Sequence, residues 1–173
     1  MDRRAPGLTA AMRIRGPFDI ALVILAIALA SIAGAFVFEA LGYPPCELCL
    51  KERIPYYAAI PIAGLALLSA ARGSKTLSHA AFVVLALIFA ASAILGSYHM
   101  GIEWGFWPGP KECSGSLDRA RSVDDFLKQL QSVKVARCDA PALRILGLSL
   151  AGWSALVSAG LAALAVAGAR SRG

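Results

Sequence analysis

Charged side chains are almost missing from four long stretches of this sequence. Asp, Glu, Lys and Arg together make up 16% of the 173 residues, whereas 58% are hydrophobic, and the mean hydropathy is +0.65. Soluble domains have no comparable unbroken apolar runs, and about 20 mostly apolar residues cross the roughly 30 Å of hydrocarbon in a bilayer. The sequence therefore predicts an all-α membrane protein, a bundle of four transmembrane helices at approximately residues 18–38, 54–70, 80–97 and 146–168.

A basic face with interleaved aromatic side chains is also lacking, although the net charge is +6. Nucleic-acid binding normally requires such a face. The basic residues instead lie at the ends of the apolar stretches, as they do in membrane proteins. We therefore expect contact with a lipid bilayer and no nucleic-acid partner. The first apolar stretch is longer than the 7–15 residues or so of a signal-peptide core, so we read it as an uncleaved first span.

Acidic residues are almost absent from three segments that four spans place on one side of the membrane. These are the N-terminal segment, the connection between the second and third spans, and the C-terminal segment. They carry the basic residues Arg3, Arg4, Arg13, Arg15, Arg72, Lys75, Arg170 and Arg172. The positive-inside rule predicts that this side, with both termini, is cytoplasmic. The loops 39–53 and 98–145 then lie outside the cytoplasm. With no internal repeat or low-complexity linker, residues 1–173 are expected to form a single membrane domain.

Cysteine is missing from every predicted span and every predicted cytoplasmic segment. All four cysteines fall in the two extracytoplasmic loops, at Cys46, Cys49, Cys113 and Cys138. Disulfides persist in oxidising compartments outside the cytosol and are rare inside it. The distribution therefore indicates disulfide chemistry on one side of the membrane.

The loop 98–145 contains one segment with helical periodicity. Its apolar residues repeat at helical spacing, at Val123, Phe126, Leu127, Leu130 and Val133. Ser122 is suited to cap such a helix, and Asp124 and Asp125 suit the positive end of its dipole. We expect a short amphipathic helix that either lies on the bilayer or packs against the bundle.

Cys46 and Cys49 form a CxxC motif that leads directly into the second span. Two cysteines at this spacing are typical of dithiol redox centres. If the helix begins near Pro45, both sulfurs lie in its first turn, where the helix dipole favours the thiolate. Arg53 follows Cys49 by one helical turn, so on a continuous helix it shares that face. A purely structural disulfide and half of a zinc site are the alternatives. We favour redox chemistry over zinc because the other two cysteines offer no second CxxC and zinc requires more ligands, so no metal is expected.

Cys113 and Cys138 are widely spaced, and nothing local to either indicates an activated thiol. Such a pair in an exported loop more often forms a disulfide that stabilises the fold than a disulfide that takes part in a reaction. A redox role for this pair is supported only because the other extracytoplasmic loop contains the CxxC motif. Thiol–disulfide exchange passes electrons between two dithiols if the loop brings them together.

Two longer sequence segments resemble those of one known protein family. The sequence YPPCELCLKERIPY at residues 43–56 resembles the CxxC region of the DsbB family of disulfide bond formation proteins, and YHMGIEWGFWPGPKEC at residues 98–113 resembles the start of its long loop. The number of spans, the order of loops and the late cysteine before the last span are also similar. The likeness therefore covers almost the whole chain.

The resemblance implies an enzyme of the bacterial inner membrane, a protein dithiol:quinone oxidoreductase. Such a protein reoxidises DsbA, a periplasmic oxidase with a thioredoxin fold, and passes the electrons to ubiquinone or menaquinone, which supports disulfide formation in periplasmic proteins. It implies redox-active disulfides Cys46–Cys49 and Cys113–Cys138, with Cys113 forming the mixed disulfide with DsbA. Cys49 would face the quinone with the Arg53 cation beside it. Glu52 and His99 match the remaining polar positions of the family, and either could help deliver the protons that quinone reduction needs; anchoring at the interface is the alternative for His99.

Two other functions are compatible with parts of the pattern. One is a non-catalytic membrane subunit or adaptor that carries two structural disulfides. The other is a quinone-dependent enzyme of the vitamin K epoxide reductase type, which also uses four helices and cysteine pairs. In that type the CxxC lies near the end of the last bundle helix, whereas here it precedes the second span, which argues against it.

Glycines and aromatic residues in the apolar regions have plainer interpretations. We expect close approach of helices at a set of small residues, namely Gly34, Gly64, Gly96, Gly147 and Gly152. Aromatic residues just beyond the third span are expected to form an interfacial belt, namely Tyr98, Trp104, Phe106 and Trp107. Trp153 is expected to pack within the fourth span.

Overall fold

The computed structural model describes residues 16–110, 122 and 137–171. Four long helices dominate these residues, with one short hairpin before the last helix: α1 (Pro17–Ala40), α2 (Glu47–Ala71), α3 (Lys75–Glu103), β1 (Arg144–Ile145), β2 (Leu148–Ser149) and α5 (Leu150–Arg170). All four helices are long and apolar enough to cross a membrane. The prediction of an all-α bundle of four membrane helices is therefore confirmed.

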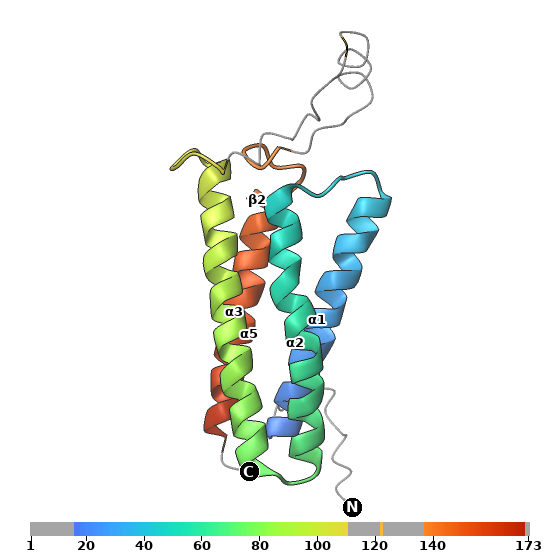
Figure 1. Cartoon of the computed structure of the whole chain (residues 1–173), viewed down its shortest axis with the longest axis vertical. Helices are drawn as coiled ribbons and strands as arrows, with labels where there is room; N and C mark the ends of the chain where they lie inside the picture. The colour runs from blue at the N-terminus through green and yellow to red at the C-terminus, as the bar shows by residue number, and fades with distance from the viewer. Residues whose placement is uncertain (1–15, 111–121, 123–136, 172–173) are drawn as a thin grey trace, which may run out of the picture.

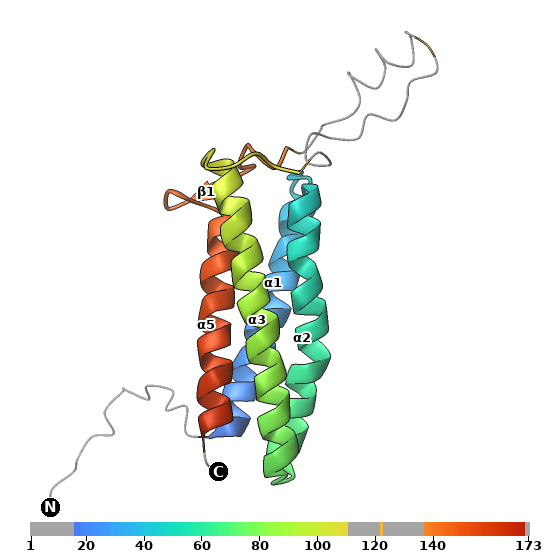
Figure 2. The same ribbon diagram turned by 60° about the vertical axis from the view of Figure 1, so that its left-hand side comes forward.

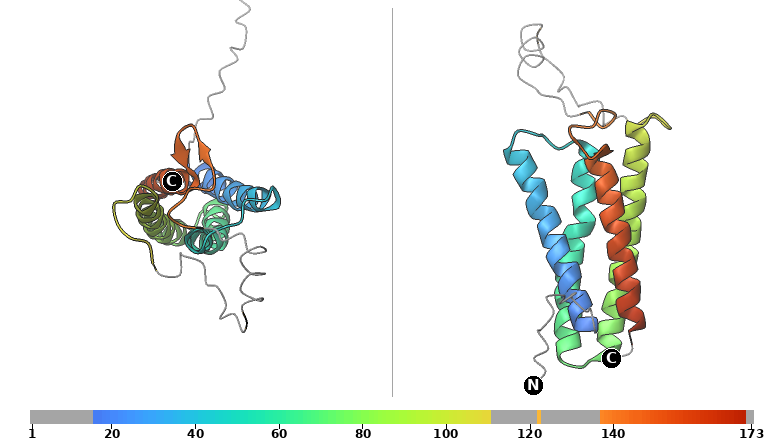
Figure 3. Two further views of the ribbon diagram at one scale, coloured as in Figure 1. Left: turned by 90° about the horizontal axis from the view of Figure 1, so that it is seen from above. Right: turned by 180° about the vertical axis from the view of Figure 1, so that it is seen from behind.

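The helices run side by side along one long axis (Figure 1). Helix α1 begins and α5 ends at the same end of the bundle as the turn between α2 and α3 (Figures 1 and 2). The opposite end carries the α1–α2 connection and the hairpin of β1 and β2. Helix α3 packs along both α5 and α2, and α1 packs along α2 but touches α5 much less. Helix α1 leans away from α5 toward the hairpin end, as the view from behind shows (Figure 3).

The second span is longer at its start than the sequence predicted. Helix α2 begins at Glu47 instead of about residue 54, and it includes the polar residues that follow the CxxC motif. Only residues 41–46 separate α1 from α2, so α2 begins within the predicted loop 39–53, close to Pro45, as considered from the sequence. The helix extends this far because the Cys46 side chain caps it and Glu47 supplies an acidic group at its positive end.

The fourth span begins later than predicted. Residues Leu146 and Gly147 have positive φ angles of 54° and 82°, which are the values of a two-residue hairpin turn and not of a helix. Strands β1 and β2 pair antiparallel across this turn, with Ile145 opposite Leu148. Helix α5 starts at Leu150, where the Ser149 hydroxyl accepts a hydrogen bond from the Gly152 backbone N–H. An apolar run alone did not distinguish the hairpin from the helix that follows it.

The interior of the bundle contains a few large apolar side chains, and many others point outward. The largest fully buried apolar side chains are Phe82, Phe89, Ile24, Leu85 and Leu161. Many other large apolar side chains are exposed along the helices, among them Leu22, Leu29, Leu87, Ile94 and Leu156. A water-soluble protein rarely exposes apolar surface of this extent. This surface fits contact with lipid.

Close helix approach occurs at fewer glycines than predicted. A Cβ atom added at Gly96 would lie 2.9 Å from the Ala155 backbone nitrogen of α5, so α3 and α5 are in near-backbone contact there. A Cβ at Gly34 or Gly64 would meet nothing within 4 Å. The expectation was therefore right for Gly96 and wrong for these two positions. Gly147 lies in the hairpin turn and serves its positive φ.

This difference makes a matched pair of substitutions informative. Gly96→Ala is expected to destabilise the bundle by about 1–3 kcal/mol, because the new methyl group must push α5 away. Gly64→Ala is expected to stabilise it by about 0.5–1 kcal/mol, because alanine favours the helix and has open space around it. Unfolding in mixed micelles, followed by circular dichroism, measures both. Equal effects at the two positions would contradict the close α3–α5 contact.

Two sequence predictions fall on residues outside the described part of the chain. The amphipathic helix expected after Ser122 lies at residues 123–136, and Cys113 lies in the segment 111–121. Both remain predictions.

Candidate functional site

Cys46 and Cys49 lie at the N-terminus of α2, at the hairpin end of the bundle. Cys46 is the N-cap residue, and its sulfur accepts a hydrogen bond from the Cys49 backbone N–H at 3.2 Å. Both cysteines are free thiols, so the structure describes the reduced form of the pair. The predicted position in the first turn is therefore correct, and the predicted Cys46–Cys49 disulfide remains a prediction for the oxidised form.

A buried polar chain links Cys46 to α3. The His99 ring nitrogen Nε2 lies 3.6 Å from the Cys46 sulfur, and its Nδ1 lies 2.6 Å from the Glu52 carboxylate. The side chains of His99 and Glu52 are only 3% and 9% exposed. A buried carboxylate and imidazole are stable in such surroundings only as a hydrogen-bonded pair. The contact fixes the orientation of the ring and aims Nε2 at the sulfur.

The surroundings of Cys46 favour its thiolate. A hydrogen bond from Cys49 is the largest cause that lowers the pKa of Cys46, burial opposes it, and a hydrogen bond from His99 lowers it further. The result is a pKa of about 5, against an ordinary value of 9.0. Because the shift is downward, the reduced protein carries the thiolate at neutral pH and loses it only as the pH falls through about 5.

The ultraviolet absorbance of thiolates tests this shift directly. In reduced, chelator-treated protein with Cys113 and Cys138 replaced by serine, the first thiolate is expected to titrate with a midpoint near pH 5. His99→Ala is expected to raise that midpoint, since it removes one of the groups that lower the pKa. His79→Ala is the matched control, because the His79 ring lies elsewhere and contacts the Ala169 carbonyl. A midpoint near pH 9 in the protein with both histidines intact would refute the assignment.

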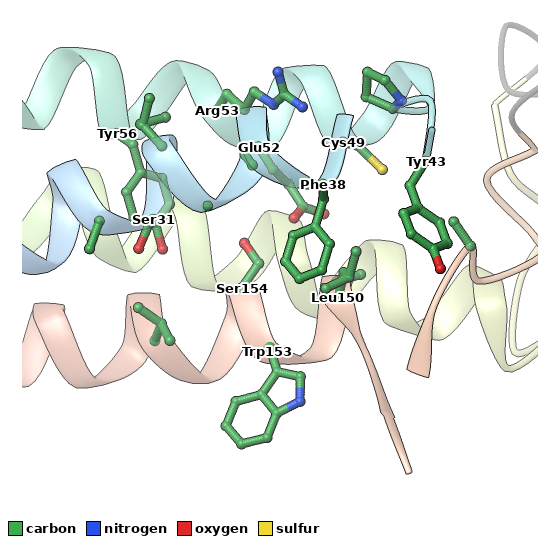
Figure 4. A pocket seen from close by; sticks show the side chains of 18 of the residues that line it. Ser31, Phe38, Tyr43, Cys49, Glu52, Arg53, Tyr56, Leu150, Trp153 and Ser154 are labelled. Atoms are coloured by element: carbon green, nitrogen blue, oxygen red, sulfur yellow. The ribbon is translucent and has the colours of Figure 1, made fainter. Parts of the chain in front are cut away.

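A cavity of about 320 Å³ opens beside Cys49. Helices α1, α2 and α5 and the segment before Cys46 line it, mostly with apolar side chains such as Phe38 and Val157. Cys49 and Glu52 lie on its α2 side, with Ser154 and Trp153 across from them on α5 (Figure 4). The cavity lies where α1 leans away from α5. It therefore offers an apolar chamber with a thiol at its wall.

Arg53 also lines this cavity, one helical turn after Cys49. Its guanidinium donates a hydrogen bond to the Glu39 carboxylate at 2.9 Å and lies 5.2 Å from the centre of the Phe36 ring. The side chain of Arg53 is 12% exposed. These contacts from α1 hold the cation at the rim of the cavity, on the same helix as Cys49, as the spacing predicted.

Cys138 lies close to the CxxC motif, although the two are distant in sequence. It is 1% exposed and belongs to one buried cluster with Cys46, Leu48 and Ile102, against which Cys49 also packs. Cys138 is disulfide-bonded. Its predicted partner, Cys113, is outside the described residues, so that pairing stays a prediction.

Some members of the site had no signal in the sequence. The run of residues 43–56 indicated Cys46, Cys49, Glu52 and Arg53, but nothing local indicated that His99 meets Cys46 from another helix. The α5 wall of the cavity was missed as well. Trp153 was expected to pack within its span, whereas it is 36% exposed, lines the cavity and donates a hydrogen bond to the Ile145 carbonyl.

Comparisons with known proteins support the family resemblance of the sequence. The family model described as "Disulfide bond formation protein DsbB" matches residues 18–168. The chain is 28% identical over 140 residues to "Uncharacterized protein RP370" of Rickettsia prowazekii (strain Madrid E), an alignment that covers 79% of this chain and 78% of that protein. No solved structure matches the chain.

Proposed function

The chain belongs to the DsbB family of disulfide-bond formation membrane proteins, and we propose that it is a dithiol:quinone oxidoreductase. In this proposal it oxidises a DsbA-like periplasmic protein with a thioredoxin fold. Two cysteine pairs, Cys113–Cys138 and Cys46–Cys49, carry the electrons to ubiquinone or menaquinone. Residues 1–173 act as a single domain in the bacterial inner membrane.

One observation carries this proposal: the Cys49 thiol lies at the wall of an apolar cavity within a membrane bundle. A quinone ring is flat and apolar, with two carbonyl oxygens that gain negative charge on reduction. The lining fits such a group, because apolar side chains surround it and the Arg53 cation and the Glu52 carboxylate lie at one wall. Arg53 would stabilise the negative charge. Cys49, Glu52 and Arg53 would therefore hold the quinone head group.

The first steps are exchanges between sulfur atoms. A thiolate of the partner attacks the Cys113 sulfur, forms a mixed disulfide and releases Cys138; the second thiol of the partner then breaks that bond and leaves oxidised. The reduced pair Cys113 and Cys138 next reduces the Cys46–Cys49 disulfide, so two electrons and two protons move inward. Burial of Cys138 in the cluster with Cys46 and Cys49 supports a short path for this exchange.

The last step returns the CxxC motif to its disulfide. A quinone, as the second substrate, would accept two electrons and two protons from this site and leave as the quinol. Cys49 faces the cavity and is the sulfur placed to give up electrons. Cys46, held as a thiolate by its N-cap hydrogen bond and His99, then forms the S–S bond with Cys49. Glu52 borders the cavity and contacts His99, so the pair is placed to move a proton between the sulfurs and the cavity.

The orientation follows from the same proposal. The cysteine end of the bundle would face the periplasm, where the partner protein and oxidising conditions are found. The opposite end, with the α2–α3 turn, would face the cytoplasm, in line with its basic residues Arg72 and Lys75.

A coupled assay tests the proposed reaction. Purified full-length protein, given a reduced DsbA-like protein and a soluble quinone, is expected to consume two thiols for each quinone reduced. Thiols are counted with a chromogenic disulfide reagent, and quinone loss is followed by its absorbance. Without either substrate no turnover is expected. A folded protein that leaves both substrates unchanged would favour the adaptor with structural disulfides instead.

A further inference from the structure

The reduced CxxC motif and His99 bring three possible metal ligands together at the end of the bundle. Their three donor atoms, the two sulfurs and one imidazole nitrogen, all lie within 4.8 Å of one another. We propose that Cys46, Cys49 and His99 form a zinc site with three protein ligands in the reduced protein. The sequence alone disfavoured zinc, because a lone CxxC motif provides only two ligands. His99 on α3 provides a third.

The distances suit a tetrahedral metal. Zinc lies about 2.3 Å from a thiolate sulfur and about 2.0–2.1 Å from an imidazole nitrogen, which places these two donors about 3.5 Å apart in a tetrahedron. The observed separation of the Cys46 sulfur and His99 Nε2 is 3.6 Å. The Cys49 sulfur lies within 4.8 Å of both, so it needs to move by no more than about 1 Å to complete the three-ligand set.

The surroundings of His99 are those of a metal ligand. Its Nδ1 lies 2.6 Å from the Glu52 carboxylate, so the ring gives its Nδ1 proton to that hydrogen bond. Its Nε2 faces the Cys46 sulfur and becomes the ligand atom once the metal displaces the proton between them. A carboxylate behind the histidine orients the ring and increases its basicity in zinc proteins. Both side chains are buried, which holds the ring in place before any metal arrives.

Ligand chemistry and charge select the metal. Two thiolates and one imidazole are the donors that zinc prefers among the common divalent ions, whereas calcium and magnesium prefer oxygen. Binding displaces the Cys49 thiol proton and the proton between His99 Nε2 and the Cys46 sulfur, and the two thiolate charges neutralise the ion. Cys49 borders the cavity, so the fourth position is open to water or to a small donor from that side. Three protein ligands and one open position are the arrangement of catalytic zinc sites, whereas structural zinc sites have four protein ligands.

Zinc and the disulfide exclude each other, because both use the same sulfur electrons. The metal would bind only the reduced motif and would keep Cys46 and Cys49 from forming their S–S bond. Zinc would then inhibit transfer of electrons to the quinone, a consequence that rests on the proposed function. Binding itself does not rest on it.

Cobalt substitution tests the site. Quinone-depleted full-length protein with Cys113 and Cys138 replaced by serine is reduced with a phosphine and titrated anaerobically with Co²⁺. One equivalent is expected to produce thiolate-to-cobalt charge-transfer bands and the visible bands of a tetrahedral ion, and one equivalent of Zn²⁺ is expected to remove them. The same protein with its CxxC oxidised is expected to give neither signal. Octahedral spectra or no bands in the reduced protein would overturn the proposal.

Variants locate the third ligand. His99→Ala and His99→Gln are expected to weaken Co²⁺ binding at least about tenfold, since each removes one donor, and Glu52→Gln about tenfold through the orientation of the ring. His79→Ala, which changes the other of the two histidines, is expected to bind like its parent. Circular dichroism identifies the variants that are folded. If His99→Ala does not fold, His99→Gln still removes the imidazole but keeps a polar group beside Glu52. Unchanged affinity in a folded His99 variant would overturn its role.

The coupled thiol–quinone assay on protein with all four cysteines separates this inference from the proposed function. Inhibition by Zn²⁺ that a chelator reverses is the expected result. Metal binding without any quinone activity would refute the proposed function and leave the site standing. Quinone activity without metal binding would refute the zinc site and leave the proposed function standing.

Discussion

Replacing Cys49 by serine is expected to lower quinone-dependent thiol oxidation at least about a thousandfold, as losses of this kind accompany removal of a reacting group. Cys49 is the thiol at the cavity wall, and a hydroxyl does not donate electrons to a quinone or close a disulfide with Cys46. Serine has nearly the same size, and the hydrogen bond to the Cys46 sulfur comes from the backbone N–H of residue 49. The fold should therefore survive. Quinone absorbance at fixed reduced partner protein measures the loss.

The neighbouring residue provides the control. Leu50→Ala changes an exposed side chain on the same helical turn that does not line the cavity, so its rate should stay within about twofold of the parent, as expected of a surface change. The serine variant should still form a mixed disulfide with the partner through Cys113. Retained quinone reduction in folded Cys49→Ser protein would remove Cys49 from the proposed pathway.

The second large effect is expected at His99. His99→Ala removes one member of a buried ion pair and leaves the Glu52 carboxylate without its partner. Such a loss costs about 3 kcal/mol or more of unfolding free energy. Quinone reduction should fall about a hundredfold in protein that remains folded, because a proton-transfer group of this kind contributes at least about that factor. Unfolding in mixed micelles and the coupled assay measure the two effects separately.

A double-mutant cycle isolates the contact itself. His99→Ala and Glu52→Gln, singly and together, should give an interaction energy of at least about 1 kcal/mol, since the two side chains are within hydrogen-bond distance. His79→Ala, at an exposed position on the same helix, should change stability by about 0.5 kcal/mol or less. Strict additivity of the two substitutions would show that the pair does not act as a unit.

The fold was largely predictable because lipid imposes a simple rule on sequence. Each helix must present some 20 apolar residues to hydrocarbon, so the four spans were recognisable without any knowledge of packing. The residues at which the helices begin were harder to predict from the sequence. Residues 47–53 carry charge and fell outside the predicted span, yet they form the first turns of α2 because Cys46 caps the helix and Glu52 is buried against His99. Residues 146–149 are apolar and looked like helix, yet Leu146 and Gly147 turn a hairpin.

The sequence by itself determined four membrane helices, the four cysteines between them, the CxxC motif at the start of the second helix and the likeness to the DsbB family. These depend on apolar length and on short local motifs, both of which are visible in a linear order of residues. The tertiary structure decided which groups meet. It brought His99 of α3 to Cys46, placed Cys138 in the same buried cluster, and built the cavity beside Cys49 from α1, α2 and α5. Contacts between residues about 50 to 100 positions apart depend on how helices pack, and no local pattern in the chain records that packing.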